Sequence, residues 1–565
     1  MKGSLFLGVV VAATMLFAST ANATLIWDTV TGDGTATTPG AGIWQDGGGL
    51  LWNDGVTPNV AWSNTGLDRD AQFEAQTSSA TPVTVSGTVA PTSLTIAYPL
   101  GGTGTLGVYT LGGGTIQFDG TTPTIMLDAS HFWVRETALK TVAGQTLTVN
   151  STSATNGFVS TMYLYGDTPS QLAGTTVLGD GINEIMAVIR NQNSLSTGEF
   201  VVNEKSSLFI QNTYPTTADL TINHAISISG NGCVNGSHAG KGAIESYKLG
   251  TAGSNNIDTT FNGAITLADS ATIGWVNSDI IFHGNISGDH ELILKRNSES
   301  TWGNVENYVR FVGTVDVAKL RVGNLNTASA SKAYYDVEGT FSADEIEIGG
   351  NSRLRVLNDG ITTFGDLDVP LITLRETNSR IFADYTYESG QTLQGIGVAH
   401  YAHVAGAGVT IAPGVDGIGT LTFSSGSLDL SGGGNVTWQL GALADDVTGV
   451  AGSDFDLINA PSSTITLGGS SQLTLDFSLL GTAGPDSADS FWTEDHSWTV
   501  ASSATGTTGN FASLVNSVFA TGSFSTSLDG DNVVLSFSAV PEPSSVAMLA
   551  GLISMLAVGF RQRKP

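Results

Sequence analysis

The sequence has a single cysteine, Cys233, among 565 residues. One cysteine cannot form an intrachain disulfide, so a large core must hold this long chain together without covalent crosslinks. Charged residues are also scarce, at 13%, and long amphipathic helices, which carry such residues on their exposed face, are hard to find. Glycine is abundant (71 residues) and 41% of the chain is hydrophobic, which excludes a disordered chain and predicts many short strands joined by tight turns.

Basic residues are the rarest of the charged ones. There are 21 Lys and Arg against 50 Asp and Glu, which gives a net charge of −29 and a pI near 4.3. An acidic surface repels the phosphates of nucleic acids and anionic lipids, so we expect no nucleic-acid partner. The charge keeps a Gly-rich secreted protein soluble; the alternative is that it binds divalent cations or a cation-bridged polysaccharide.

The N-terminus has the three parts of a secretory signal. Met1-Lys2 supplies a positive start, residues 5–17 form an apolar core, and Ala21-Asn22-Ala23 is an A-x-A cleavage site. These features predict a signal peptide over residues 1–23, with Ala21 and Ala23 at the cleavage site and a mature chain that begins at Thr24.

The C-terminus carries a second ordered arrangement. Pro541-Glu542-Pro543 is followed by an apolar segment over 546–560 and then by a basic tip. The basic residues of that tip are Arg561, Arg563 and Lys564. Lys and Arg resist translocation, so this tip should stay on the cytoplasmic side of a membrane. The apolar run is shorter than the ~20 residues that a spanning helix usually needs, which suits a transient transmembrane anchor.

The order of motif, apolar segment and basic tip over 541–565 resembles the PEP-CTERM sorting signal of Gram-negative bacteria. The resemblance implies that an exosortase in the inner membrane recognises Pro541, Glu542 and Pro543 and processes the chain near them. It also implies release to the outer surface or to the exopolysaccharide matrix. The alternative is an ordinary tail anchor.

Short alternating runs recur from about residue 81 to residue 480. Each run places an apolar residue next to Thr or a charged residue, which predicts strands with one buried and one wetted face. Examples lie at 83–85, 94–96, 115–118, 146–149, 265–267, 346–348, 354–356 and 473–475. Gly-rich turns separate them, as at 112–114 and 432–435.

Two architectures fit this pattern: an array of β-sandwiches and a parallel β-solenoid. A solenoid stacks each strand on the same strand of the next coil, with repeats roughly 20 to 50 residues apart. The sequence shows no strict period, which the irregular coils of a β-helix also allow. We predict an all-β fold, a right-handed parallel β-solenoid (β-helix) over 81–480 with small terminal β caps.

The segment 24–80 differs from the rest in its tryptophans. Trp27, Trp44, Trp52 and Trp62 lie there among Gly and Asp, and Ala71-Gln72-Phe73 follows. The pattern predicts an aromatic cap over one end of a β stack. It loosely resembles the start of autotransporter-associated β-strand proteins. Exposed tryptophans that bind sugar are the alternative interpretation.

A closer resemblance lies at 400–480. Residues 408–414 (GVTIAPG) and 417–423 (GIGTLTF) resemble the element "APG…GTLT" of autotransporter passenger β-helices. The resemblance implies a β-helix, and the element is structural in that family, so no functional residue follows from it. Residues 481–540 form a separate segment with a possible short helix at 511–519 and a final strand at 533–537. We interpret it as a C-terminal β cap.

Several motifs could carry chemistry. Gly102-x-Gly104-x-x-Gly107 matches a dinucleotide fingerprint, which needs a helix after it, but strands are predicted on both sides. We therefore interpret it as a β turn. His400 and His403 have a spacing that could bind a metal on a helix, but their flanks predict strand or loop. We expect packed or exposed histidines.

Carboxylate pairs are the candidate catalytic groups of a polysaccharide hydrolase or lyase. They are Asp445-Asp446 and the pair Asp454 and Asp456, which would share one face of a strand. The segments 180–184 and 529–531 resemble fragments of Ca²⁺ loops without the full ligand spacing. Turn chemistry is the interpretation we favour for all of them, so we predict no catalytic residue, no metal site and no cofactor.

Together these observations predict a non-enzymatic structural protein that is exported and passes through an inner-membrane intermediate. Its expected destination is the outer surface or extracellular matrix of a Gram-negative bacterium, where it could also act as an adhesin. The expected partners are the exosortase, an exopolysaccharide or cell-surface glycans, and transiently the inner membrane. The alternative is a carbohydrate-active enzyme on the same scaffold, which requires Asp, Glu, Arg or Lys clustered beside aromatic rings on one face.

Overall fold

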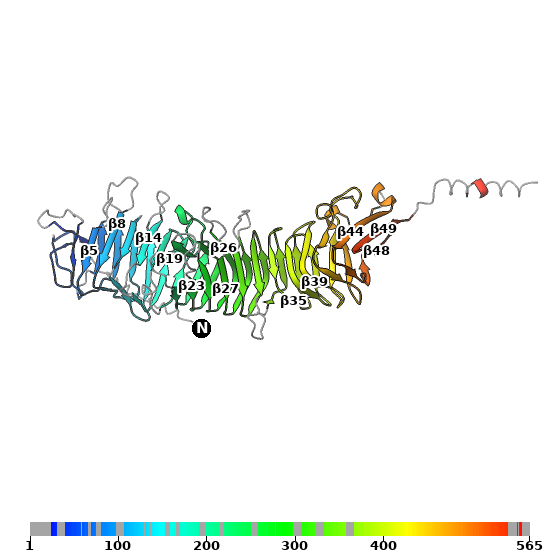
Figure 1. The fold of residues 1–565 in the computed structure, drawn as a ribbon. Coiled ribbons are helices and arrows are strands. Elements are labelled where there is room, and N and C mark those ends of the chain that lie inside the picture. Colours follow the sequence, from blue (N-terminus) through cyan, green and yellow to red (C-terminus); the bar gives the residue numbers. More distant parts are fainter. Residues whose placement is uncertain are drawn as a thin grey trace, which may run out of the picture.

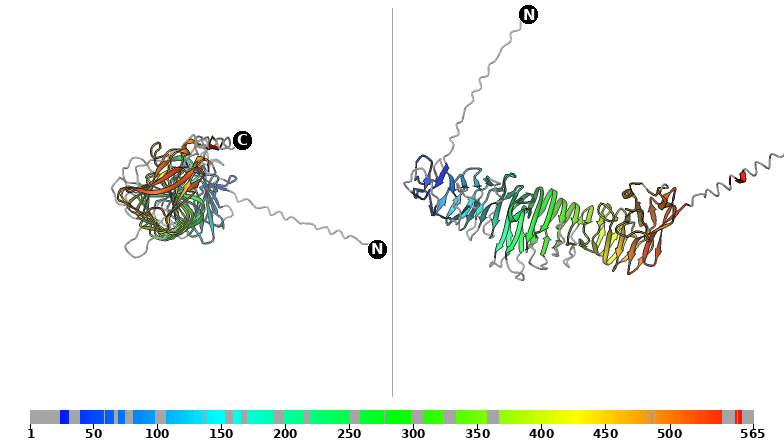
Figure 2. Two further views of the ribbon diagram at one scale, coloured as in Figure 1. Left: turned by 90° about the vertical axis from the view of Figure 1, so that its right-hand side faces the viewer. Right: turned by 90° about the horizontal axis from the view of Figure 1, so that it is seen from above.

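The protein is an elongated stack of β-strands (Figure 1), with 57% of its residues in strands and 3% in helices. Viewed along its length, the stack has a narrow cross-section (Figure 2). The computed structural model describes residues 24–30, 40–57, 59–65, 69–74, 81–97, 107–128, 130–135, 137–152, 159–164, 170–190, 198–213, 219–249, 258–276, 278–297, 307–323, 333–356, 367–482, 484–486, 489–540, 551 and 553–555.

Most strands of the described residues belong to two long sheets. Sheet A has 28 strands and sheet C has 17, and a small sheet B of four strands lies in the N-terminal half. The strands of sheet A are β1 (Thr24–Trp27), β2 (Gly42–Trp44), β3 (Trp52–Asn53), β4 (Asp70–Glu74), β5 (Thr81–Val85), β7 (Ser93–Ala97), β8 (Gly107–Gly112), β10 (Thr124–Leu127), β11 (Ser130–Val134), β13 (Thr146–Ser151), β14 (Ser160–Leu164), β16 (Thr175–Leu178), β17 (Ile185–Ile189), β18 (Phe200–Val202), β19 (Ser206–Thr213), β21 (Ile226–Gly230), β22 (Ile244–Leu249), β24 (Ile265–Val276), β26 (Ile286–Arg296), β28 (Val315–Val322), β30 (Phe341–Ile348), β32 (Leu367–Asp368), β33 (Leu371–Leu374), β36 (Thr392–Gly395), β38 (Thr410–Pro413), β40 (Asn435–Gln439), β43 (Gln472–Asp476) and β46 (Ser513–Val515).

The strands of sheet B are β6 (Thr88–Val89), β9 (Thr115–Gln117), β12 (Ala138–Thr141) and β15 (Gln171–Leu172). The strands of sheet C are β20 (Leu220–Ile222), β23 (Asp258–Phe261), β25 (Asp279–Phe282), β27 (Asn307–Phe311), β29 (Ala333–Val337), β31 (Ser352–Val356), β34 (Arg380–Phe382), β35 (Tyr385–Tyr387), β37 (Val398–Ala405), β39 (Thr420–Asp429), β41 (Leu457–Ala460), β42 (Thr464–Thr466), β44 (His496–Ser503), β45 (Thr507–Thr508), β47 (Val518–Phe519), β48 (Gly522–Asp529) and β49 (Asn532–Ala539). Short 3₁₀ turns lie at η3 (Gly236–His238), η4 (Ser478–Leu480) and η5 (Ser490–Thr493).

The pairing between successive coils is parallel, as in a β-solenoid. Ile265 of β24 pairs with Ile286 of β26, which pairs with Val315 of β28. The spacing between partners varies: Thr392 pairs with Thr410, 18 residues on, whereas Gln472 pairs with Ser513, 41 residues on. Parallel pairing begins at β1, where Thr24 lies beside Asp70, and extends to β46. The predicted all-β fold of stacked parallel strands is therefore confirmed.

The core lies inside the stack, where alternate residues of each strand point inward. Strand β13 is typical: Leu147 and Val149 are buried, and the Thr residues beside them are half-buried. All eight runs that the sequence pattern predicted as strands lie in strands or directly at their ends. The alternate buried side chains of successive coils join into one continuous apolar core, and in β17 and β29 the other face is buried as well.

Four coils share a corner of the form Phe/Val-x-Gly-x-Ile/Val/Phe between sheet C and sheet A. The corner glycines are Gly263, Gly284, Gly313 and Gly339. A Cβ on Gly284 would lie 2.0 Å from the carbonyl oxygen of Gly263, so the backbones of two coils approach too closely for any side chain. This repeat is hard to recognise in the sequence because loops of unequal length separate its copies.

The residue that precedes the corner builds a stack of aromatic rings in the core. Phe261 and Phe282 lie with ring centroids 5.3 Å apart, and Phe282 and Phe311 lie 5.7 Å apart, both pairs stacked. Each ring is 1% exposed. Equivalent positions on successive coils therefore contact one another, as the parallel register requires.

The N-terminal coils contain a cluster of buried tryptophans. Trp27, Trp44, Trp52 and Trp62 are 0–1% exposed, and Trp52 contacts Phe73 at 5.4 Å between centroids. Because these rings are buried, they are not available to bind sugar from solvent, and the alternative of exposed sugar-binding tryptophans is wrong. Their burial agrees with a packing role.

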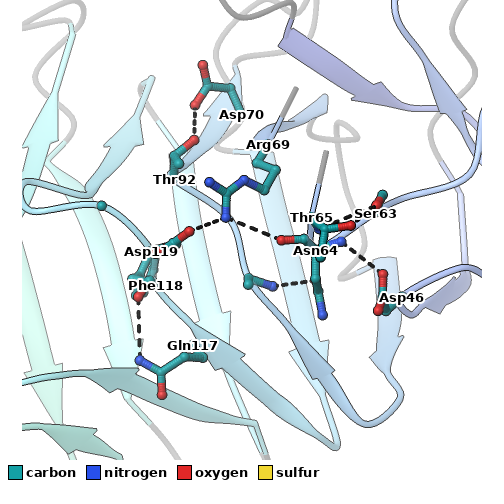
Figure 3. A network of polar contacts seen from close by, with 12 residues as sticks. Asp46, Ser63, Asn64, Thr65, Arg69, Asp70, Thr92, Gln117, Phe118 and Asp119 are labelled. Carbon is teal, nitrogen blue, oxygen red and sulfur yellow. Dashed lines mark hydrogen bonds and ion pairs between the residues drawn. The ribbon is translucent and has the colours of Figure 1, made fainter. Parts of the chain in front are cut away.

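Polar contacts connect the same coils at their surface (Figure 3). Arg69 forms an ion pair with Asp119 and donates to the carbonyl of Asn64 at 3.3 Å. The Asn64 backbone N–H donates to Asp46 at 2.9 Å, and its side-chain oxygen accepts from the N–H of Ala90 at 2.8 Å. These bonds satisfy polar groups where the chain leaves one coil and enters the next.

The C-terminal segment does not contain the helix that the sequence predicted at 511–519. Strands β46 and β47 lie there instead, and Leu514 pairs with Leu473 of the preceding coil. Extension of the parallel sheet outweighed the local helical pattern. The final strand was predicted correctly, as β49, which pairs antiparallel with β44 and β48.

Candidate functional site

The most distinctive surface of the described residues lies on five neighbouring strands of sheet C: β27, β29, β31, β34 and β37. Their inward side chains, such as Val309 and Leu354, are fully buried. Two rows of side chains flank this buried row; Tyr334 and Asp336 are themselves buried, and the other members of the rows are half-buried. We call them together the arginine–aromatic surface: Tyr308, Tyr334, Arg353 and Arg380 in one row, and Arg310, Asp336, Arg355, Phe382 and His400 in the other.

Tyrosine rings and an arginine stack at one end of this surface. Tyr308 and Tyr334 lie face to face with centroids 5.1 Å apart. The guanidinium of Arg355 lies 5.1 Å from the ring of Tyr308 and 4.7 Å from that of Tyr334. Such cation–π contacts fix the planar guanidinium beside the rings.

A second aromatic platform lies two coils further along. The rings of Phe382 and His400 are parallel within 3° and their centroids are 4.1 Å apart. Arg353 lies between the two platforms, 5.1 Å from the Tyr334 ring and 5.7 Å from the Phe382 ring. It also donates a hydrogen bond to the Tyr334 hydroxyl at 2.8 Å.

Two of the four arginines on this surface have carboxylate partners. Arg355 donates to both oxygens of Asp336, at 2.6 and 2.5 Å, and Arg310 pairs with Glu338 at 2.6 Å. Burial raises the pKa of Asp336 against the lowering effect of Arg355. These carboxylates are held in ion pairs, which leaves neither of them free to act on a substrate.

The other two arginines have no carboxylate partner among the described residues. Arg353 and Arg380 are neighbours in the sheet register, and the Nε atoms of both are buried without a hydrogen-bond partner in the described part of the chain. Desolvation and the charge of Arg353 lower the pKa of Arg380. Burial, Arg380 and Arg353 lower the pKa of His400 to about 4, so that His400 is neutral at neutral pH. The surface therefore has an excess of positive charge in an acidic protein.

A second surface feature is an acidic cleft of about 430 Å³ on sheet A. It is lined by Asp289, Asp316, Asp344 and Asp368 from successive coils, together with small residues. All four carboxylate residues are exposed to solvent. In the described part of the chain, no group of three or more His, Cys, Asp or Glu residues is arranged to hold a metal ion.

The two histidines with metal-like spacing have different environments. His403 is buried: its Nδ1 lies 3.0 Å from the Tyr387 hydroxyl and its Nε2 lies 3.1 Å from the carbonyl of His400. Burial lowers its pKa to about 4. His400 packs on Phe382 at the surface instead. Packed or exposed histidines were expected; His403 is packed in the core and His400 is half-buried.

Asp454 and Asp456 accept hydrogen bonds from backbone N–H groups. Asp456 is fully buried and accepts the N–H groups of Gly419 at 2.8 Å and Gln439 at 2.9 Å, and burial raises its pKa to about 8. Asp454 accepts the N–H of Val450 at 2.7 Å. The expected shared strand face is wrong, because both residues precede β41: Asp454 lies in a turn, and Asp456 lies directly before the strand.

The remaining acidic motifs serve turns only in part: Asp180 and Asp445 accept bonds within their own turns, whereas Asp445 and Asp446 also bond to residues of β44. Asp445 accepts from Thr448 and from Nδ1 of His496 at 2.9 Å, and Asp446 accepts the N–H of Thr499 at 3.0 Å. These bonds outweigh desolvation and lower the pKa of Asp445 to about 2. Asp180 accepts two N–H groups of its own turn.

Cys233 is also buried, and desolvation raises its pKa to about 12, which agrees with a packed rather than a reactive thiol. Of the glycine-rich motif at 102–107, only Gly107 is described, as the first residue of β8.

The sorting residues predicted from the sequence lie outside the described residues. This holds for Ala21 and Ala23, for Pro541, Glu542 and Pro543, and for Arg561, Arg563 and Lys564. Of the predicted transmembrane segment 546–560, residues 551 and 553–555 are described and are helical. Within the described ranges, no helix has both the length and the apolar character that crossing a bilayer requires.

Comparisons with known proteins assign no family to the chain. No family model matches the sequence, and no curated protein matches it at a significant level.

Proposed function

We propose that the protein is a secreted structural component of the bacterial outer surface or exopolysaccharide matrix, in which a rigid β-solenoid contacts glycans. The observation that carries the proposal is the unbroken series of parallel coils from β1 to β46 around one apolar core. Such a stack resists bending because each coil is hydrogen-bonded to the next. It also displays long rows of side chains along one axis.

Delivery to the surface depends in this proposal on the two ends of the chain. Residues 1–23 direct export, and the PEP-CTERM-like segment 541–565 holds the chain at the inner membrane until an exosortase processes it. The proposed partners are thus the exosortase, transiently the membrane, and a glycan outside the cell. We propose no enzymatic activity.

We further propose that the solenoid is right-handed and that both ends are capped. Right-handed connection of parallel strands in one sheet is the strong preference of L-polypeptides. The buried tryptophans around Trp52 support a cap at the N-terminal end. The antiparallel strands β44, β48 and β49 support a cap at the other end, because they break the parallel pairing that another chain could extend.

A carbohydrate-active enzyme is the second candidate function. One observation favours it: arginines and carboxylates lie beside aromatic rings on sheet C, which is the arrangement that this alternative requires. The ion pairs of Asp336 and Glu338 argue against it, because a general acid or base needs a carboxylate that is free to exchange a proton with the substrate. New reducing ends or unsaturated products after incubation with a polysaccharide would establish the enzyme.

The test of the proposed function is cell fractionation with mass spectrometry of the C-terminus. The wild type should appear outside the cell with a chain that ends near Pro543. A variant that lacks Pro541 to Pro543 should stay in the inner membrane, whereas a control with Ser544→Ala and Ser545→Ala should be released. Identical fractionation of the wild type and the deletion variant would overturn the proposal.

A further inference from the structure

We infer that Arg353 and Arg380 form a binding site for the carboxylate groups of an acidic polysaccharide, with the neighbouring aromatic rings as platforms for its sugar rings. The inference deepens the proposed function and rests on it for the presence of a glycan outside the cell. The site itself is a property of the arginine–aromatic surface and can be tested in solution.

Positive charge is concentrated on this surface. The chain has 21 Lys and Arg residues, and four of them lie on five successive strands of sheet C. Arg310 and Arg355 are neutralised by carboxylates, whereas no ion pair links Arg353 or Arg380 to a carboxylate of the described residues. Like charges on adjacent strands destabilise a sheet. An anion between the two guanidinium groups would remove that cost.

Hydrogen bonding also favours a carboxylate at this position. The Nε groups of Arg353 and Arg380 are buried without an acceptor in the described ranges, and solvent does not reach them. A ligand would therefore bind the terminal N–H groups of these two half-buried side chains, where Nη1 of Arg353 contacts the Tyr334 hydroxyl and Nη1 of Arg380 contacts Nε2 of His400. A guanidinium binds a carboxylate through charge-assisted N–H···O bonds, which are stronger than those to an uncharged sugar hydroxyl.

Aromatic rings lie on both sides of the arginines. The stacked rings of Tyr308 and Tyr334 lie on one side, and those of Phe382 and His400 lie on the other. Tyr334 is buried and its hydroxyl accepts from Arg353, so the half-buried rings of Phe382 and His400 are the platform on which a pyranose ring would pack. Because His400 is neutral at neutral pH, it serves as a flat ring and not as a third cation.

The direction of the rows determines how a polymer would lie. Both rows cross the strands and follow the long axis of the stack, with neighbouring strands about 4.8 Å apart. An extended 1,4-linked polyuronate advances by a similar distance per sugar, so a polymer along the axis would place successive sugars over successive coils. The acidic charge of the rest of the protein would repel the polymer and restrict it to this surface.

Binding of polygalacturonate to the purified full-length protein tests the inference by titration calorimetry. The double variant Arg353→Gln and Arg380→Gln should lower the affinity at least tenfold. The control Lys140→Gln and Lys205→Gln removes the same charge elsewhere and should change the affinity less than twofold. Replacement of both arginines by lysine keeps the charge, loses the bidentate geometry and should give an intermediate loss.

Specificity and folding are checked in the same series. Neutral dextran should not bind, and dextran sulfate should bind more weakly than polygalacturonate. Equal affinity of the wild type and the Arg→Gln variant, with unchanged circular dichroism, would overturn the inference, as would tighter binding of dextran sulfate or of duplex DNA. A secreted protein that does not bind polygalacturonate contradicts this inference alone, whereas a protein that binds it but remains in the inner membrane contradicts the proposed function alone.

Discussion

Replacement of Phe282 by alanine tests the proposal that neighbouring coils support one another through the ring stack. Phe282 is 1% exposed and lies between Phe261 and Phe311, with ring centroids 5.3 and 5.7 Å away. The substitution therefore removes two ring contacts and leaves a cavity between three coils. No polar group is involved, so the loss of packing alone determines the result.

The expected cost comes from the burial and the two contacts. Truncation of a buried Phe to Ala costs about 3–5 kcal/mol of unfolding free energy. Each aromatic pair contributes about 0.5–1.5 kcal/mol beyond area burial, so the loss of two pairs places Phe282→Ala near the upper end, at about 5 kcal/mol. Phe282→Leu keeps most of the volume and should cost about 1–2 kcal/mol.

Amide hydrogen exchange is the best assay, because long repeat arrays do not unfold in one step. Stability in such arrays is a sum of each coil and its neighbours. Protection should therefore fall at β23, β25 and β27 and remain at β40 and β43. A loss below about 1 kcal/mol, or an equal loss of protection along the whole stack, would refute the reasoning.

Three further predictions follow from single residues. Gly284→Ala should lower the unfolding free energy by about 2–3 kcal/mol, because its Cβ would lie 2.0 Å from the Gly263 carbonyl oxygen. The control Gly417→Ala, which has open space at the Cβ, should change the melting temperature little. Equal shifts of the melting temperature in the two variants would contradict a close approach of the coils at the corner. The raised pKa of Asp456 means that the folded state holds this proton more tightly, so stability should fall as the pH rises from about 4 to about 8. Exchange at the amide of Gln439 should follow that pH dependence, which Asp456→Asn should abolish; a variant with the wild-type profile would exclude Asp456 as its source. Cys233, with a pKa raised to about 12 by burial, should react with iodoacetamide only after denaturation, and rapid labelling of the native protein would show that the thiol is accessible.

The strands could be predicted from the sequence because their pattern is local. Alternation such as Leu147-Thr148-Val149 determines which side of a strand is buried, whatever the neighbouring coil is. The repeat itself was missed, because its constant part is short and the loops between its copies differ in length. The predicted helix at 511–519 was wrong for the same kind of reason, since the pairing of Leu514 with Leu473 is not visible locally.

The arginine–aromatic surface could not be predicted from one strand at a time. Within a single strand, nothing distinguishes these residues from other side chains that flank a buried position. This holds for Tyr308 and Arg310 of β27 and for Arg353 and Arg355 of β31. They become a surface only when the register places Tyr334 beside Arg353 and Arg353 beside Arg380. The one available signal was Tyr or Arg on both sides of a single apolar residue, at 308–310 and at 353–355, in two strands that are separated in the sheet only by β29.

The unequal lengths of the coils have a consequence for how the chain reaches its native pairing. In an array of identical repeats, a strand can dock one repeat too early or too late and still find a matching partner, which is a common route to misfolding. Here a slip of β36 from β38 to the next strand, β40, would replace an 18-residue separation between partner residues by a much longer one. The rings and corner glycines would then meet loops instead of their counterparts. Because the coils differ in length, slipped pairings are less stable than the native one. A long stack can therefore assemble with a single register.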